Sequence, residues 1–408
     1  MDPASSVPRH WINRSTLGLA LASLLSDISH ELATAVLPAF LIALGGGPLA
    51  LGLIEGLSDG GSALAKLWGG WKADRLQRRK PLASIGYLIT AAGVAAVGWC
   101  TALWQVGLCR LVAWLGKGSR SASRDLLLSE AAAPADLGKA YGLERAGDSL
   151  GAVAGPLLAL WLLSLGWSAK GMLKLSLIPG LMAFLALMLL VKETAGVVSH
   201  KGLPLRGAWK AAGAPFRKLI AGVALFGLGD FSRTLLIMFV MRHLVAPEGG
   251  PGKTGYGFAS AAGLAVGLYA LHNAITALAA LPLGALADRV GRRKILAAGY
   301  AFAALVTLGF ALLPATPFWL TILFCGSGLY IACQEVAEKS GAVELLPREG
   351  RGLGLGLLAA VNGLADTTSS ALIGLLWMLQ PDRPAVGFFV AAGLQAAGAR
   401  LVFKQRRS

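Results

Sequence analysis

Ionisable side chains recur inside long apolar stretches of this sequence. A charge at the centre of a lipid bilayer costs about 2.5–3.5 kcal/mol on insertion scales, so each needs a function or a partner. Carboxylates and histidines also bind cations and exchange protons. We therefore expect a polar cavity that binds a solute and protons. The candidate residues are Asp27, His30, Glu31, Glu55, Asp59, Arg110, Glu144, Arg145, Asp148, Asp230, Arg233, His272, Asn273, Asn362 and Asp366.

Spacing and depth support this grouping. Asp27, His30 and Glu31 are three or four residues apart, which places them on one face of a helix. Asp27, Asp59 and Asp230 each lie about eleven residues from a predicted helix end, or ~16 Å along the axis. That depth is the midplane of a ~30 Å hydrocarbon core. An acid-rich cavity with histidines suits a cationic solute, such as a metal ion or metal chelate.

The alternative is that some of these charges form static salt bridges. Arg145 with Asp148, and Asp230 with Arg233, are each one helical turn apart. A further set is expected near the cytoplasmic ends of the helices, as a gate between two halves of the chain. It consists of Arg124, Asp125, Glu338 and Lys339.

The composition favours a membrane protein. Of the 408 residues, 55% are hydrophobic and 14% are charged, whereas soluble domains average about 25% charged residues. The net charge of +16 comes from short basic clusters between apolar runs, which is typical of cytoplasmic loops and not of a nucleic-acid-binding face. The four cysteines, Cys100, Cys109, Cys325 and Cys333, lack C-x-x-C spacing, so we expect buried thiols rather than a zinc site or a disulfide framework.

Twelve segments are long and apolar enough to span a bilayer. We expect a six-helix bundle over 16–191, a basic cytoplasmic linker over 192–217 and a second bundle over 218–403, with tails at 1–15 and 404–408. Most of the 37 Lys and Arg residues fall on the side of both tails, which predicts cytoplasmic termini. The predicted spans are 16–43, 48–70, 82–99, 102–118, 138–165, 169–191, 218–243, 256–284, 295–313, 317–340, 352–379 and 384–403.

An eleven-residue pattern, G-x-x-x-D-R-x-x-R-R-K, begins at Gly70 and again at Gly284. It resembles motif A of the major facilitator superfamily, which follows helices 2 and 8, although Gln77 replaces a usual glycine. The resemblance implies an all-α membrane fold of 12 helices in two pseudo-symmetric bundles, with a conformational latch in these loops. The alternative is that the basic residues only set topology. The latch residues would be Gly70, Asp74, Arg75, Arg78, Arg79, Gly284, Asp288, Arg289, Arg292 and Arg293.

Two further resemblances concern the transport cycle. Gly151, Gly155 and Pro156 resemble motif C, which the superfamily associates with antiporters, and imply a hinge; Ala159 departs from that motif. Arg110 resembles the arginine of motif B, which implies proton coupling.

We therefore expect a secondary active transporter that works by alternating access, coupled to protons and acting as an exporter. An importer or uniporter is the alternative. No Walker motif or nucleophile–base arrangement occurs, so we expect no enzyme activity and no cofactor; an intramembrane enzyme or a receptor is the rival class. The expected partners are a small solute or ion, protons and lipid, and no nucleic acid. We expect a monomer in the plasma membrane.

Overall fold

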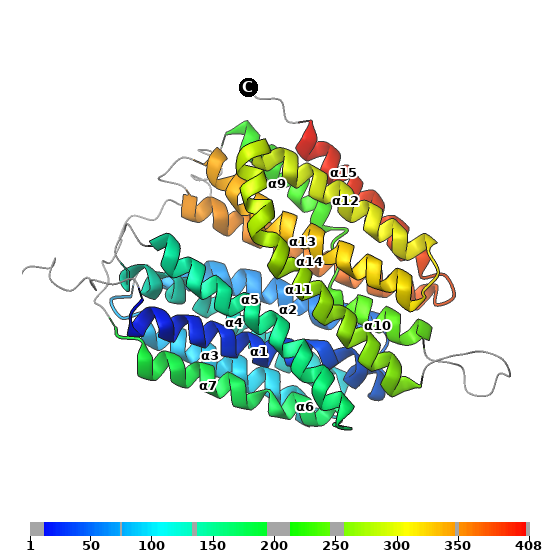
Figure 1. Cartoon of the computed structure of the whole chain (residues 1–408), viewed down its shortest axis with the longest axis horizontal. Helices are drawn as coiled ribbons and strands as arrows, with labels where there is room; N and C mark the ends of the chain where they lie inside the picture. The colour runs from blue at the N-terminus through cyan, green and yellow to red at the C-terminus, as the bar shows by residue number, and fades with distance from the viewer. Residues whose placement is uncertain are drawn as a thin grey trace, which may run out of the picture. The chain divides into compact units, whose positions relative to one another are not determined.

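The computed structural model describes residues 12–73, 76–132, 137–193, 213–244, 257–346 and 351–404, which are almost entirely α-helical (Figure 1). No strand occurs within these ranges. The elements are α1 (Arg14–Ala43), α2 (Pro48–Ala73), α3 (Lys80–Ala96), the 3-10 turn η2 (Val97–Trp99), α4 (Leu103–Glu130), α5 (Leu137–Ser164), α6 (Ala169–Leu175), α7 (Leu177–Leu190), α9 (Ala214–Gly227), α10 (Arg233–Leu244), α11 (Phe258–Val290), α12 (Arg292–Leu312), α13 (Pro317–Leu345), α14 (Arg351–Leu379) and α15 (Ala385–Phe403).

These helices correspond to the twelve predicted spans, with three corrections. The predicted fourth span ended at residue 118, but α4 continues to Glu130. The sixth is divided at Ser176 into α6 and α7. The seventh, predicted as one helix over 218–243, is interrupted between α9 and α10.

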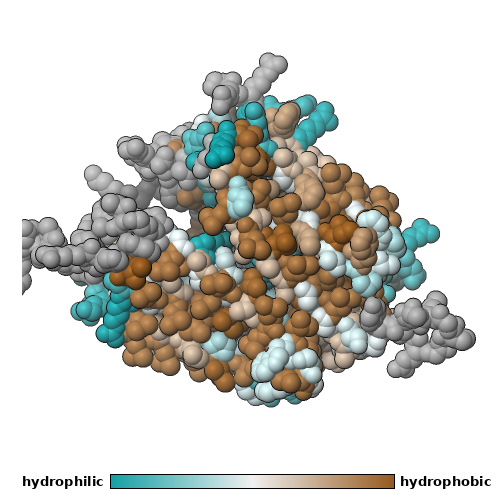
Figure 2. Space-filling model, viewed as in Figure 1, coloured by the Kyte–Doolittle hydropathy of each residue, from teal (hydrophilic) through white to brown (hydrophobic). Residues whose placement is uncertain are grey.

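Eight helical segments of the described chain are long and apolar enough to cross a membrane by length and composition. They do not include α2, α4, α14 or the interrupted α9–α10 pair. Hydrophobic residues cover most of the face in Figure 2. Since lipid-facing surface must be apolar, both observations agree with a multi-pass membrane protein.

The chain forms two compact units. Unit 1 comprises Met1–Val36 and Gly61–Gly202, and unit 2 comprises Leu37–Gly60 and Leu203–Ser408. Residues 37–60 thus pack with the second unit, although they precede much of the first in the sequence. The predicted linker over 192–217 falls mostly on 194–212, outside the described residues, so the predicted domain boundaries stay a prediction.

Each unit has its own buried core. In unit 1, Leu19, Tyr87, Leu128 and Leu187 join α1, α3, α4 and α7. In unit 2 the core is aromatic: the ring centroid of Phe388 lies 5.1 Å from that of Phe239, 5.2 Å from Trp377 and 5.5 Å from Phe310. Rings at these separations add attraction beyond the area they bury.

Three glycines of α5 allow it to contact α1 directly. Gly147, Gly151 and Gly155 recur at every fourth position, which aligns them on one face. A Cβ atom on these residues would lie 2.5 Å from the Ala20 carbonyl oxygen, 2.5 Å from that of Leu24 and 2.7 Å from the Glu31 Cβ, respectively. The small residues therefore hold the two backbones together. Whether Gly151, Gly155 and Pro156 also form a hinge stays a prediction.

The interruption between α9 and α10 leaves backbone groups without helical hydrogen bonds. Side chains from other helices of unit 2 supply their hydrogen-bond partners. The Gln395 side chain donates to the Gly229 carbonyl at 3.0 Å, and the Ser232 amide donates to Ser370 Oγ at 3.0 Å. Gly229 itself is required, because a Cβ there would lie 2.4 Å from the Ala391 carbonyl oxygen. Broken membrane helices are tolerated where neighbours supply such partners, and hydropathy alone does not reveal these partners.

We expect Gly151→Ala to lower the free energy of unfolding by about 1–3 kcal/mol, because the new methyl group would overlap α1. Gly142→Ala is the matched control on α5, where an added Cβ meets nothing within 4 Å. There alanine is neutral or stabilises the helix by up to ~1 kcal/mol. Thermal unfolding in detergent compares the two variants, and equal melting temperatures would show that the α1–α5 contact tolerates a side chain.

Candidate transport site

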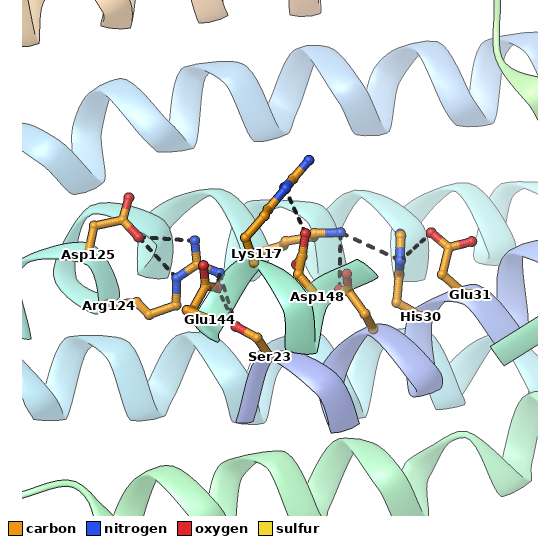
Figure 3. Close-up of polar contacts among 10 residues, drawn as sticks. Ser23, His30, Glu31, Lys117, Arg124, Asp125, Glu144 and Asp148 are labelled. Carbon is orange, nitrogen blue, oxygen red and sulfur yellow. Dashed lines mark hydrogen bonds and ion pairs between the residues drawn. The ribbon is translucent and has the colours of Figure 1, made fainter. Parts of the chain in front are cut away.

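The polar centre of unit 1 combines side chains of α1, α4 and α5 (Figure 3). Lys117 Nζ lies 3.5 Å from His30 Nδ1 and 3.9 Å from Asp27 Oδ1. His30 Nδ1 also lies 3.2 Å from Glu31 Oε1. Asp27 and His30 are buried, whereas the Lys117 side chain is 32% exposed. The three predicted residues of α1 are therefore together, as their spacing indicated, and a lysine lies among them.

A third carboxyl group, that of Asp148 on α5, belongs to the same cluster. It lies close enough to Asp27 for the two carboxyl groups to interact electrostatically. Its Oδ2 also accepts a hydrogen bond from Arg145 at 2.8 Å. The Arg145 side chain is 52% exposed. The predicted pairing of Arg145 with Asp148 is thus present in the structure, and Asp148 connects that pair to Asp27.

An aromatic ring borders the cluster. The Trp114 ring centroid lies 4.6 Å from that of His30 and 3.7 Å from the Arg110 guanidinium carbon. Arg110 is almost fully buried, so its charge is stabilised in part by the π face of the indole. On the same helix, Arg120 lies over the Tyr87 ring at 3.6 Å and donates to Ser26 Oγ at 2.7 Å.

A second ion-pair group of unit 1 lies along the same helices (Figure 3). Arg124 of α4 contacts Glu144 of α5 at 2.8 Å and its neighbour Asp125 at 3.0 Å. Ser23 of α1 donates to Glu144 at 2.5 Å. Glu144 is therefore an ion-pair partner within unit 1. The predicted gate between Arg124 or Asp125 and the residues Glu338 and Lys339 joins the two units, and it stays a prediction.

In unit 2, Asp230 lies in the interruption between α9 and α10. Its Oδ1 is 2.8 Å from Arg233 Nη1, as the predicted pairing requires. Arg233 also donates to the Phe231 carbonyl at 2.6 Å, and Tyr330 donates to Asp230 at 3.4 Å. Asp230 is buried and Arg233 is partly buried, and the pair is bound to the backbone of the helix interruption through the Phe231 carbonyl.

Glu338 of α13 is buried beside neutral partners. Tyr300 Oη donates to one carboxyl oxygen and Asn362 Nδ2 donates to the other at 2.7 Å. Tyr300 in turn stacks on Phe226 with ring centroids 3.7 Å apart. The adjacent Lys339 is exposed. Glu338 and Lys339, which were predicted to belong to one gate, thus occupy different environments. Asn362, a predicted solute ligand, binds Glu338.

The other predicted polar residues also fall in unit 2. Asp59 and Asp366 lie close enough to interact electrostatically, and Thr367 Oγ1 donates to the Gly56 carbonyl at 2.7 Å. These residues of unit 2 were predicted to share one cavity with Asp27. Because Asp27 belongs to unit 1, the shared cavity stays a prediction. Of these residues, Glu55 and His272 are buried, and Asp59, Asn273 and Asp366 are partly buried.

The first motif copy anchors the helix ends of unit 1. Arg79 is buried and forms an ion pair with Glu130 at the end of α4, while its amide donates to Glu193 at 2.6 Å. Lys80 Nζ donates to the Val191 carbonyl at 2.6 Å, where the end of α7 leaves carbonyls without helical partners. Arg78 is exposed. The motif therefore binds α3, α4 and α7 together in unit 1.

The second copy lies between α11 and α12 in unit 2. Arg292 donates to the Ser340 carbonyl at 3.1 Å, and Gly291 has a φ of +109° between α11 and α12, which favours glycine. Arg289 is exposed and Arg293 is partly buried. Asp74, Arg75 and the Asp288 side chain lie outside the described residues. The latch role of both copies stays a prediction.

Sequence reasoning missed Lys117, Trp114 and Arg120. Lys117 falls near the end of the predicted span 102–118, but it was not among the predicted site residues. A signal was present: Arg110, Trp114 and Lys117 have i, i+4, i+7 spacing, which places them on one helix face. Arg120 and Arg124 extend the run of basic residues on α4.

Comparisons with known proteins identify the family. The sequence model of the Major Facilitator Superfamily matches residues 19–261 and again 253–407. The chain belongs to this superfamily of membrane transporters. It is 28% identical over 372 residues to an MFS-type transporter of Methanocaldococcus jannaschii, covering 91% of this chain and 90% of the relative.

Of two other similarities, one covers part of the chain and the other concerns the fold alone. Over 124 residues the chain is 32% identical to the multidrug resistance protein MdtH of Cronobacter sakazakii, which covers 30% of this chain and 31% of the relative. The crystal structure of a mutant of the nucleoside transporter NupG covers 95% of this chain and 98% of its own, with a TM-score of 0.78 at 15% identity. At that identity the likeness shows the fold alone.

We expect Arg79→Met to lower the free energy of unfolding by about 3 kcal/mol, because it leaves the Glu130 carboxylate without its buried cation. Arg78→Met removes the adjacent, exposed basic residue of the same motif, and its effect should stay within ~0.5 kcal/mol. Unfolding in detergent measures both variants. A similar loss from both would mean that the motif acts through its total charge, as a topology signal alone would.

Proposed function

We propose that this chain is a proton-coupled antiporter that exports a small, positively charged solute by alternating access. The observation that carries the proposal is the cluster of Asp27, Glu31, Asp148 and His30 around Lys117. Carboxylates in a membrane-spanning unit need positive charge to balance them. A proton, the lysine or a cationic solute can each supply that charge.

The contacts indicate which charge is exchangeable. Arg124 is held at 2.8 Å by Glu144 and Arg145 at 2.8 Å by Asp148. Lys117 is held more loosely, at 3.9 Å from Asp27. A cationic solute that approaches Asp27 would therefore displace Lys117 first. Solute and proton would then compete for the same carboxylates, which is the requirement for exchange.

Other observations bear on the direction of transport and on the membrane in which the protein lies. The partial likeness to a multidrug resistance protein and the resemblance of the α5 glycines to motif C favour export. The basic clusters favour cytoplasmic termini in a plasma membrane. Import or uniport by the same cluster is the second candidate, and pH dependence separates it from antiport.

Flux into proteoliposomes tests the proposal. The panel is divalent metals, a metal chelate, cationic drugs and organic anions, each with and without a pH gradient. We expect a cationic compound to move against its gradient when protons flow the other way. Asp27→Asn and Asp148→Asn should each reduce that flux at least about tenfold, equivalent to ~1.4 kcal/mol of lost interaction.

Asp382→Asn is the matched control, because Asp382 is an exposed carboxylate in the turn before α15 and should leave flux unchanged. If flux of every compound ignores the pH gradient and survives both core substitutions, the acids are structural and the chain is a uniporter.

Lys117→Gln tests the sign of the solute's charge. Removing a competing cation should lower the KM for a cationic solute several-fold, while the pH-driven rate falls because the carboxylates lose their alternative partner. Lys170→Gln, at an exposed lysine of α6, is the control for a lost surface charge. A raised KM in Lys117→Gln would instead indicate an anionic solute that binds the lysine directly.

A further inference from the structure

Two cysteines that are far from C-x-x-C spacing meet in unit 1. Cys100 follows the turn η2, and Cys109 lies in the second turn of α4. Their Sγ atoms are 3.8 Å apart, and both are free thiols. Cys100 is buried and Cys109 is partly buried.

The register of the α3–α4 hairpin brings the thiols together. A Cβ on Gly86 would lie 2.5 Å from the Arg120 Cβ, and one on Gly93 would lie 2.9 Å from the Ala113 amide. Gly86 and Gly93 are seven residues, or two helical turns, apart, so they share the face that α3 turns to α4. Cys100 follows α3 and η2, at the end of the hairpin where α4 begins. Because the glycines hold the two backbones in contact, Cys100 reaches Cys109 at the end of the hairpin.

The thiols lie at one surface of the membrane. The other end of α3 begins at Lys80, directly after the basic motif, which the positive-inside rule places in the cytoplasm. The Cys100 end then faces the opposite compartment. Trp99 and Trp104, which flank it, are 56% and 69% exposed, as expected for tryptophans at a membrane–water interface. Disulfides form and persist at cell surfaces and in the bacterial periplasm, which are oxidising environments.

We propose that Cys100 and Cys109 form a reversible disulfide at the outer surface of the membrane, by exchange with a protein or small-molecule disulfide. The Cys109 thiolate attacks one sulfur of the oxidant and releases the first oxidant thiolate. The Cys100 thiolate then attacks the Cys109 sulfur of the mixed disulfide and releases the second. Two electrons pass to the oxidant, and the two protons of the cysteines leave with its two thiols.

The different burial of the two thiols sets the order of the two steps. Burial, together with the neighbouring Cys109 thiol, raises the pKa of Cys100 to about 12. Cys109 is the less buried of the pair, so an oxidant reaches it first. Cys100 then needs only to close the 3.8 Å gap to the S–S bond length of about 2 Å. The bond would join α3 to α4 inside unit 1, so it should stabilise that unit without linking it to unit 2.

Oxidised glutathione, which does not cross bilayers, tests the inference on the full-length protein in right-side-out and inside-out membrane vesicles. After oxidation, free thiols are alkylated, the protein is digested and the masses of its peptides are measured by mass spectrometry. In right-side-out vesicles we expect Cys100 and Cys109 to escape alkylation together and their linked peptides to weigh about 2 Da less, the mass of two hydrogens. Cys325 and Cys333 of α13 should remain alkylated.

Single substitutions separate the two steps. Cys100→Ser should leave a lasting glutathione adduct on Cys109, and Cys333→Ser should behave as wild type. Full alkylation of Cys100 and Cys109 after oxidation, or a lasting adduct in the wild type, would overturn the disulfide. Equal protection in inside-out vesicles would overturn its placement. The wild-type masses decide both points even if a variant does not fold.

Discussion

The need to balance buried charge governs the interior of unit 1. Basic side chains follow one another along α4, in a chain whose helices cross a membrane. Each of them meets a partner from another helix or an aromatic ring: Arg110 meets Trp114, Lys117 meets Asp27, Arg120 meets Tyr87 and Ser26, and Arg124 meets Glu144. Without such partners these charges would favour expulsion of α4 from the membrane. The arrangement of α1, α4 and α5 is therefore an electrostatic requirement as well as a packing solution.

Small residues make that balance possible. Gly151 brings α5 so near α1 that an added Cβ would lie 2.8 Å from the Asp27 Cβ. The same contact carries Asp148 toward Asp27. Charge pairing and glycine packing are thus not independent, because the glycines set the distance at which the carboxyl groups interact. A larger side chain in this contact would alter the site's electrostatics as well as its stability.

The two units bury polar groups in different ways, although their sequences repeat. Both units contain an Asp-x-Ser sequence. Asp27-Ile28-Ser29 lies inside the uninterrupted α1, whereas Asp230-Phe231-Ser232 lies where the helix is interrupted. Unit 1 relies on ion pairs between helices. Unit 2 holds Glu338 with a phenol and an amide, and pairs Asp230 with Arg233 across one turn. A repeat in sequence therefore does not require two equivalent sites.

The sequence by itself determined the membrane class, the approximate positions of the twelve spans, the superfamily and the shared face of Asp27, His30 and Glu31. Hydrophobicity, motif spacing and helical periodicity are properties of neighbouring residues along the chain, so they can be read locally. Only the tertiary structure placed Lys117 in the site, interrupted the helix at Asp230, buried Arg79 against Glu130 and brought Cys100 to Cys109. Each of these depends on a partner from a distant or antiparallel segment. A charge on α4 has the same local sequence whether it ends a helix in water or meets an acid inside the protein, and only the packing of other helices decides between the two.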